Sequence, residues 1–338
     1  MTTATTTTEL LQYDRTLGLS VMEGRGFYYP ADTVIGDNGR LYVVNRSLES
    51  VDRGVRVTVC DIESEYYGTF GSYGEGDGQF IWLTSGAKNS AGDIYLTDEY
   101  MHRVTAFDAD GNFLQVWGTH GSGEGELDGP CGIAFDADDN LYVSDTYNNR
   151  VQKFTAGGVH LASFGVGALS MPWGMTIAPS GDIYVADWGN DRVARFTQGG
   201  EFVAAYGEPG RGEGQLVKPA SVAADARGNV YVADWGNERV QAFDDAGNFQ
   251  QLLRGEATLS PWATNFLSIN REEGEARSRA DLERDIDFFD PDDPHEVSSH
   301  IEKYFWAPMS VKLDGKGRLF VTESNRHRVQ VYRVNDDA

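Results

Sequence analysis

An acidic residue precedes an arginine by five positions in five separate stretches of the chain. The pairs are Asp98/Arg103, Asp145/Arg150, Asp187/Arg192, Asp234/Arg239 and Glu323/Arg328. A carboxylate beside a guanidinium can take part in catalysis, but a catalytic acid is needed once and this pair recurs. We therefore interpret the pairs as structural contacts that lock a repeated hairpin or bridge neighbouring repeats. If they are partly buried, removing one partner should cost about 3–5 kcal/mol, because the other charge is left unpaired.

Two histidines stand directly before the arginine of their units, at His102 and His327. The other units have Asn149, Asp191 and Glu238 at this position. Imidazole can act as a general base or bind a metal ion, so the two histidines are candidates for catalysis. With Cys131 and Met309 they offer soft-metal ligands, but the four residues belong to three different repeats and have no ligand spacing. We predict no metal site and no cofactor.

Asp32 is the remaining catalytic candidate, because it is the only acid at its position in the repeat. It could act as a base or as a single calcium ligand, although calcium needs several oxygen ligands. The sequence has no Ser/His/Asp order, paired-carboxylate motif or Cys-x-x-Cys. Asp32, Cys131, His102 and His327 are therefore the catalytic candidates.

Aromatic side chains recur beside the acidic residues. Trp188 and Trp235 follow the aspartates, and Tyr100 and Tyr147 stand one residue later in their units. Near a central opening we expect Trp173 and Met309, with Trp82 as a further candidate. A partly exposed aromatic ring of this kind would suit sugars, peptides or apolar ligands. The alternative is that each ring packs between neighbouring hairpins.

The elements that position these residues are repeated hairpins. The stretch 183–193 recurs almost unchanged at 230–240, with looser copies at 94–104, 141–151 and 319–329, and a divergent copy beginning at Leu41. Alternating β-branched residues with a fixed step between two runs indicate a hairpin. The acids recur every 42 to 47 residues, apart from a last gap of 89 residues. Repeats of about 40–50 residues with short strands are typical of propeller blades.

The sequence thus predicts an all-β fold: a six-bladed β-propeller with four-stranded blades over residues 10–338. A proline opens five of the units, at Pro30, Pro130, Pro172, Pro219 and Pro308. We expect residues 1–9 to be a disordered tail and a strand at Leu17–Met22 to complete the last blade, which closes the ring and removes an open sheet edge. The Asp/Arg hairpins and the blade-to-blade loops should share one face, which we call the top face.

The long gap predicts a helical insertion at 254–306 in the fifth blade, on the top face. Two helices are expected. Leu282, Ile286 and Phe289 fall at helical spacing, as do Val297, Ile301 and Phe305. Asp293 as N-cap, followed by Pro294, marks the start of the second helix. The insertion either covers the channel mouth or packs to one side.

Composition limits the partners. The net charge of −24 argues against nucleic acid and against anionic membranes, and it favours solubility. Cys60 and Cys131 lie in different repeats, so we expect no disulfide and a reducing compartment. Residues 1–8 lack the features of a signal peptide, and no run approaches the ~18 apolar residues of a membrane span. We expect a cytoplasmic protein.

The pattern Pro-x-Gly-Ile-Ala, Gly-Asn-x-Tyr-Val-Ala-Asp and Asn-x-Arg-Val-Gln-x-Phe resembles the NHL repeat, most fully at 130–154 and 219–243 and over roughly 27–334. The resemblance implies a six-bladed propeller. The family includes RNA-binding and protein-binding platforms, kinase sensor domains and an amidating lyase. That lyase should have zinc-binding histidines just after the blade-opening proline. The residues here are Ala31, Thr84, Cys131, Trp173, Ala220 and Met309, so its zinc site does not carry over.

Two functions remain. The first is a binding platform that holds a protein, peptide or small-molecule ligand on the top face and at the channel mouth. The alternative is a hydrolase or lyase with its active site at the channel mouth, under the 254–306 insertion. A purely structural subunit of an acidic assembly is a third reading.

Overall fold

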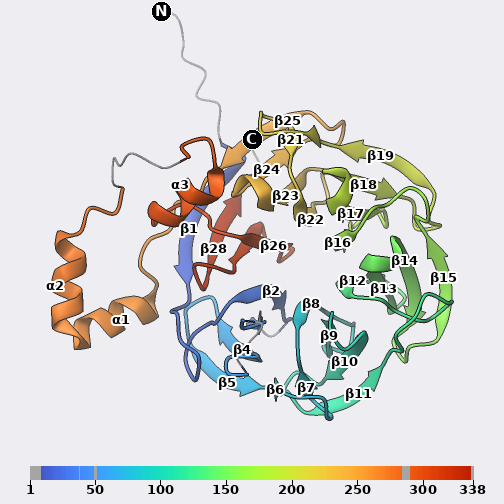
Figure 1. The fold of residues 1–338 in the computed structure, drawn as a ribbon, viewed down its shortest axis with the longest axis horizontal. Coiled ribbons are helices and arrows are strands. Elements are labelled where there is room, and N and C mark those ends of the chain that lie inside the picture. The colour runs from blue at the N-terminus through green and yellow to red at the C-terminus, as the bar shows by residue number, and fades with distance from the viewer. Residues whose placement is uncertain (1–8, 38, 49–51, 284–289, 336–338) are drawn as a thin grey trace, which may run out of the picture.

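The computed structural model describes residues 9–37, 39–48, 52–283 and 290–335. In this part of the chain, six four-stranded antiparallel sheets form a closed ring, as predicted (Figure 1). The first strand of each blade contacts the first strands of both neighbouring blades, so these six strands surround the axis. No described helix is long and apolar enough to cross a membrane.

The strands follow the chain from the axis outwards. Blade 1 contains β2 (Pro30–Ile35), β3 (Arg40–Asn45), β4 (Arg56–Asp61) and β5 (Tyr66–Phe70). Blade 2 contains β8 (Leu83–Lys88), β9 (Ile94–Asp98), β10 (Arg103–Phe107) and β11 (Phe113–Trp117). Blade 3 contains β12 (Pro130–Phe135), β13 (Asn140–Asp145), β14 (Arg150–Thr155) and β15 (His160–Phe164).

Blade 4 contains β16 (Pro172–Ile177), β17 (Ile183–Asp187), β18 (Arg192–Phe196) and β19 (Phe202–Tyr206). Blade 5 contains β22 (Pro219–Ala224), β23 (Val230–Asp234), β24 (Arg239–Phe243) and β25 (Phe249–Leu253). Blade 6 contains β26 (Pro308–Leu313), β27 (Arg318–Glu323) and β28 (Arg328–Val334). Short strand pairs brace two connections between blades: β6 (Ser72–Tyr73) with β7 (Gln79–Phe80), and β20 (Glu208–Pro209) with β21 (Gln215–Leu216).

The N-terminal strand β1 (Leu11–Leu17) closes the ring by pairing antiparallel with β28. The predicted closure is confirmed, but the predicted position at Leu17–Met22 is wrong. Residues 18–29 instead connect β1 to β2, and Gly18 turns the chain with φ 107°. The prediction favours the more apolar stretch that follows, whereas the strand itself has the alternating pattern of Leu11, Tyr13 and Leu17.

The hydrophobic core lies between the blades rather than in one central volume. Six clusters of buried side chains each join two adjacent blades, including one between blades 6 and 1. At the axis the inner strands approach so closely that glycine is required. A Cβ on Gly132 would lie 2.3 Å from the carbonyl oxygen of Trp173, and one on Gly174 would lie 2.6 Å from that of Ala220.

The segment between β25 and β26 contains α1 (Pro261–Ile269), α2 (Arg271–Arg279) and α3 (Pro294–His300). α3 begins as predicted, with the Asp293 side chain accepting from the His295 backbone N–H at 3.0 Å. It ends at His300, so Ile301 and Phe305 are buried outside the helix, contrary to the expectation. The other predicted helix lies mostly on 284–289, outside the described residues, and Leu282 is not helical.

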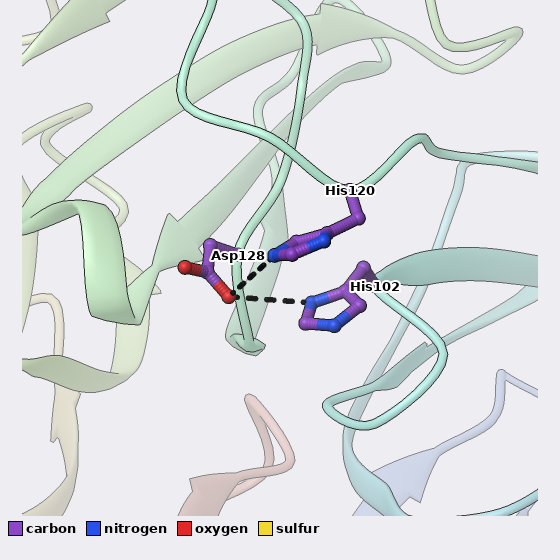
Figure 2. A group of neighbouring side chains, drawn as sticks. All are labelled: His102, His120 and Asp128. Carbon is purple, nitrogen blue, oxygen red and sulfur yellow. Dashed lines mark ion pairs between the residues drawn. The ribbon is translucent and has the colours of Figure 1, made fainter.

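A hydrogen bond across the top face links five of the six blade junctions. The residue that ends the hairpin after the second strand is left-handed, and its side chain accepts the backbone N–H of the residue before the next blade's opening proline. The acceptors, with their donors, are His102 for Gly129 (3.0 Å), Asn149 for Met171 (2.7 Å), Asp191 for Lys218 (2.7 Å), Glu238 for Ala307 (2.5 Å) and His327 for Tyr29 (2.8 Å). We call this contact the blade clasp. Figure 2 shows His102 together with His120 and Asp128.

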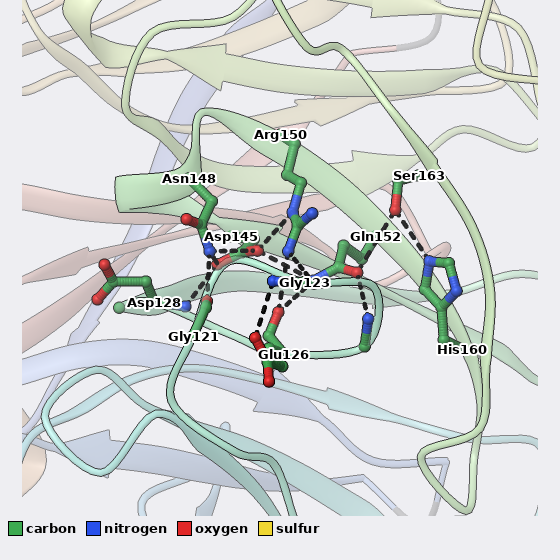
Figure 3. A network of polar contacts seen from close by, with 12 residues as sticks. Gly121, Gly123, Glu126, Asp128, Asp145, Asn148, Arg150, Gln152, His160 and Ser163 are labelled. Atoms are coloured by element: carbon green, nitrogen blue, oxygen red, sulfur yellow. Dashed lines mark hydrogen bonds and ion pairs between the residues drawn. The ribbon is translucent and has the colours of Figure 1, made fainter.

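The repeated acid joins each hairpin to the loop that enters its own blade. Asp145 accepts from the backbone N–H of Asp128 (2.7 Å), from Arg150 Nε (2.7 Å) and from the Gln152 amide (2.9 Å) (Figure 3). Arg150 also donates to the carbonyl oxygen of Gly123 at 2.6 Å. The ion pair therefore has a structural role, as interpreted from its recurrence.

Four of the five predicted acid–arginine pairs form: Asp145/Arg150, Asp187/Arg192, Asp234/Arg239 and Glu323/Arg328. The prediction of an Asp98/Arg103 pair is wrong, because these two described side chains have other partners. Asp98 accepts from four backbone N–H groups, those of Ile81, Trp82, Tyr100 and Met101. Arg103 donates to loop carbonyls, including that of Gln79 at 2.8 Å. The backbone donors therefore replace the guanidinium as partners of this carboxylate.

Candidate functional site

The central channel is narrow and filled by side chains. It is lined by the first residues of all six inner strands, including the predicted positions Ala31, Thr84, Cys131, Trp173, Ala220 and Met309. The free volume among them is about 10 Å³. At this level of the channel there is room for about one water molecule.

Asp32 joins three blades inside this channel. It is 1% exposed and accepts from Ser85 Oγ at 2.6 Å, from the Gly86 backbone N–H at 2.9 Å and from Ser310 Oγ. Lys312 Nζ lies 3.3 Å from its carboxylate. Burial opposes ionisation, but Lys312 and these donors outweigh it and lower the pKa of Asp32. The carboxylate is ionised and surrounded by donors, so it has little capacity to take up a proton.

Cys131 is buried beneath the same opening. Burial, followed by the charge of Glu99, raises the pKa of its thiol well above the ordinary range. Nucleophilic cysteines need the opposite shift, because the thiolate is the reactive form. Cys131 is therefore held as a neutral thiol. Cys60, also buried, has its pKa raised to about 12 for the same main reason.

Three tryptophans form a stack on the top face beside the channel mouth. Trp173 is the second residue of β16, while Trp188 and Trp235 lie in the turns after β17 and β23. Trp188 is the middle ring, with centroids 5.0 Å from Trp173 and 5.0 Å from Trp235. All three are partly exposed, and no described residue accepts a hydrogen bond from their indole N–H groups. The sequence expectation placed these three residues together, and the structure does so.

The remaining predicted aromatic residues lie in different surroundings. Tyr147 donates from its hydroxyl to Glu99 at 2.6 Å, and Arg46 donates to the same carboxylate at 2.7 Å. Tyr100 is 59% exposed and lines a separate top-face pocket of about 260 Å³, together with Arg46, Leu48, Tyr73 and Trp82. The predicted ring is therefore divided into a tryptophan stack, a polar group and a second aromatic pocket.

Sequence reasoning missed Arg46 and Glu99, which form the polar group with Tyr147. Both follow the second strand of their blades directly, where Trp188 and Trp235 stand in blades 4 and 5. The same alignment of the repeats that singled out the tryptophans would have identified them. Arg46 also packs over the Trp82 ring, 4.1 Å from its centroid, and so connects the polar group to the second pocket.

His102 and His327 are both blade-clasp acceptors, which explains why histidine can replace Asn, Asp or Glu at this position. Burial lowers the pKa of His327 to about 4, so its imidazole is neutral and its Nδ1 can accept the Tyr29 N–H. The His327 ring stacks on Tyr28 at 5.4 Å. His102 has a different neighbourhood, because its ring stacks on His120 at 4.0 Å.

The insertion meets the propeller through Trp262 of α1, whose Nε1 donates to the Ser64 carbonyl oxygen at 2.6 Å, and through α3. Glu238, 1% exposed in blade 5, lies 2.6 Å from His295 Nδ1, and Trp306 Nε1 donates to the other ring nitrogen at 3.2 Å. Burial raises the pKa of Glu238 to about 7, despite the opposing effect of His295. α1 and α2 lie outside the ring in the view of Figure 1, so they do not cover the channel mouth, contrary to one of the two expectations.

Comparisons with known proteins support the fold. The NHL repeat family matches residues 127–154, 169–196 and 216–243. None of the curated proteins compared with the chain matches it. A protein of unknown function from Bacteroides thetaiotaomicron is a similar structure, with a TM-score of 0.63 and 16% identity over 96% of this chain and 76% of that one.

Two further similar structures have named activities or partners. A catalytically inactive virginiamycin B lyase from Staphylococcus aureus, with quinupristin, has a TM-score of 0.55 and 10% identity, covering 96% of this chain and 99% of that one. A chain of the nidogen/laminin complex has a TM-score of 0.52 and 18% identity, covering 66% of this chain and 79% of that one. At these identities the likeness concerns the fold. The chain is therefore a six-bladed β-propeller that contains three NHL repeats.

Proposed function

We propose that the protein is a binding platform that holds a protein or peptide segment on its top face, against the tryptophan stack. The observation that carries the proposal is the stack of Trp173, Trp188 and Trp235, whose partly exposed indole N–H groups have no acceptor among the described residues. Exposed tryptophan is a frequent anchor of protein interfaces, because it combines a large apolar area with one donor.

Charge beside the stack favours a segment that offers oxygen acceptors. Lys218 Nζ lies 5.8 Å from the centroid of the Trp188 ring. The indole N–H groups and the Lys218 ammonium are all donors. A peptide satisfies them with backbone carbonyls or a carboxylate while its apolar side chains cover the ring edges. The overall charge of −24 remains unfavourable for nucleic acid.

The candidate catalytic residues support binding rather than chemistry. Asp32 is ionised and surrounded by donors, Cys131 is held as a thiol, and His327 accepts within the blade clasp. Each of them therefore has a structural role in the ring. The nidogen/laminin complex is an example of a similar propeller found in a protein complex.

The test is a peptide array of random sequences probed with the wild-type protein and two variants. Trp188→Ala with Trp235→Ala removes two rings of the stack. Phe202→Ala is the control, because Phe202 is 49% exposed on the outer strand β19, away from the mouth. We expect the double variant to lose binding by about 30-fold or more, since an anchoring tryptophan contributes about 2 kcal/mol or more. Equal binding by all three proteins would reject the tryptophan stack as the site.

An enzymatic alternative is favoured by one observation, the contact between Glu238 and His295. A buried carboxylate that orients a half-exposed imidazole is an arrangement used in general base catalysis. A hydrolase or lyase reaction at the contact between the insertion and blade 5 would use His295 as the base. The virginiamycin B lyase is a similar propeller that is an enzyme by name. Turnover of an ester or lactone panel that is lost in His295→Gln would favour this alternative over the platform.

A further inference from the structure

Two histidines and one aspartate meet at the top-face junction between blades 2 and 3 (Figure 2). His102 ends the hairpin of blade 2, and His120 and Asp128 belong to the loop that leads into blade 3. Asp128 Oδ1 lies 3.5 Å from His102 Nδ1 and 3.4 Å from His120 Nε2. Two imidazoles therefore converge on a single carboxylate oxygen, at distances longer than a good hydrogen bond.

This combination of residues occurs at one junction of the repeat. The position of Asp128, whose backbone N–H donates to the hairpin acid, is taken by Ser170, Val217, Trp306 and Tyr28 at other junctions. His327 has the same clasp position as His102 but meets Tyr28 and Tyr29 in place of a carboxylate. The structural role of the clasp thus explains His102 but not the acid or the second histidine beside it.

The distances suit a metal ion. Zinc binds histidine nitrogen and carboxylate oxygen at about 2.0–2.1 Å in a tetrahedron, whose ligands are then about 3.3–3.4 Å apart. The two separations from Asp128 Oδ1, 3.4 and 3.5 Å, are close to this edge length.

Two adjustments accompany binding. His102 Nδ1 now accepts the Gly129 N–H at 3.0 Å, and a metal ion would displace this hydrogen bond. The two rings are stacked with an interplanar angle of 22°, so one must turn for both nitrogens to face the same ion. His120 can turn, because its side chain is 63% exposed. Asp98 and Asp145 add negative charge nearby, which attracts a cation.

We propose that His102, His120 and Asp128 bind one divalent transition-metal ion of the zinc class. Three protein ligands leave the fourth tetrahedral position to water or to an oxygen atom of a bound partner. Two imidazoles and one carboxylate suit zinc better than calcium or magnesium, which prefer oxygen ligands. The site is separate from the tryptophan stack, which lies on blades 4 and 5.

The test is titration of the full-length protein with Zn²⁺ by calorimetry, and with Co²⁺ by visible absorption, which reports tetrahedral coordination. Three variants each remove one ligand: His120→Gln, Asp128→Asn and His102→Asn. The last one keeps the blade clasp, because Asn149 accepts the Met171 N–H at the equivalent position. His160→Gln is the matched control, since His160 bonds Ser163 on the outer strand β15. Thermal unfolding checks that every variant is folded.

We expect one Zn²⁺ per wild-type chain and a tetrahedral Co²⁺ spectrum. Each ligand variant should weaken binding by about 10- to 100-fold or more, and His160→Gln should bind like the wild type. Absence of Zn²⁺ uptake by the wild type would overturn the proposal. So would equal uptake by the wild type and by folded His120→Gln and Asp128→Asn, because the ion would then lie elsewhere.

Discussion

Asp32→Ala should strongly destabilise the ring without any change in the top face. Asp32 lies on β2 of blade 1, Ser85 and Gly86 lie on β8 of blade 2, and Ser310 and Lys312 lie on β26 of blade 6. The carboxylate thus joins the first, second and last blades at the axis. Its removal leaves the Lys312 ammonium, two hydroxyl groups and the backbone N–H groups of Thr33 and Gly86 without their shared acceptor.

The expected loss follows from these contacts. Breaking a buried ion pair by removing one partner costs about 3–5 kcal/mol. For a domain of this size, 1 kcal/mol corresponds to a shift of about 2 °C in the unfolding midpoint, so we expect a fall of about 6–10 °C. Lys312→Met in the same chain should recover part of the loss, because the uncompensated charge is then also removed. A coupling of about 0.5–3 kcal/mol is typical of residues in direct contact.

The assay is differential scanning calorimetry of the wild type, the two single variants and the double variant. Asp110→Ala is the control, because this carboxylate is 76% exposed and, among the described residues, pairs with Arg40 at the surface. Its removal should change the unfolding free energy by no more than about 1 kcal/mol. If Asp32→Ala unfolds within 2 °C or so of Asp110→Ala, the argument that Asp32 closes the ring is refuted.

Three further perturbations test the contacts on the top face. The folded-state pKa of His327 is about 4, below its ordinary value of 6.5. The neutral imidazole therefore contributes its full stability above pH 6.5, and the protein loses roughly 2–3 kcal/mol as the pH falls toward 4. His327→Asn should remove this pH dependence in urea titrations, because the amide accepts without titrating. Asp234→Ala should lower the unfolding free energy by about 3–5 kcal/mol in the same assay, because the buried Arg239 loses its carboxylate partner. Deleting residues 271–303 should leave a cooperatively folded ring, because all six sheets lie outside this range. The deletion should lower the unfolding free energy by about 1–3 kcal/mol, because Glu238 loses its contact with His295.

Each of these outcomes has a contrary result. The pH prediction must be tested on the difference in unfolding free energy between the wild type and His327→Asn. The raised pKa of Glu238 changes the stability in the opposite direction over nearly the same pH range, and the difference removes this effect. If this difference in unfolding free energy stays constant from pH 7 to about 4, His327 is not held as a neutral imidazole in the blade clasp. Asp234→Ala with wild-type stability would contradict a structural role for the repeated pairs. Non-cooperative melting of the deletion variant would show that the insertion is part of the ring.

The repeat made the fold predictable from sequence. Five blade-opening prolines, the fixed hairpin step and the alternating strands are local features, and each blade forms from residues adjacent in the chain. The start of α3 was predictable for the same reason, since Asp293 and Pro294 act on their own turn. α2 was missed because its sequence, rich in Arg and Glu, has no apolar periodicity to detect. The predicted position of β1 was wrong because a single strand has no hairpin partner nearby in the sequence to fix its position.

The candidate sites depended on the ring. Trp188 and Trp235 are 47 residues apart in the sequence, and their rings stack because adjacent blades bring equivalent turns together. In the sequence Asp32 has no basic partner nearby, and only the closed ring places Lys312 beside it. His102 meets Asp128 only because the loop into blade 3 returns across the hairpin of blade 2. The sequence alone determined the blades and their order, since these follow from local turn and strand chemistry. The tertiary structure decided which side chains meet across blade junctions, because those contacts depend on how the ring closes.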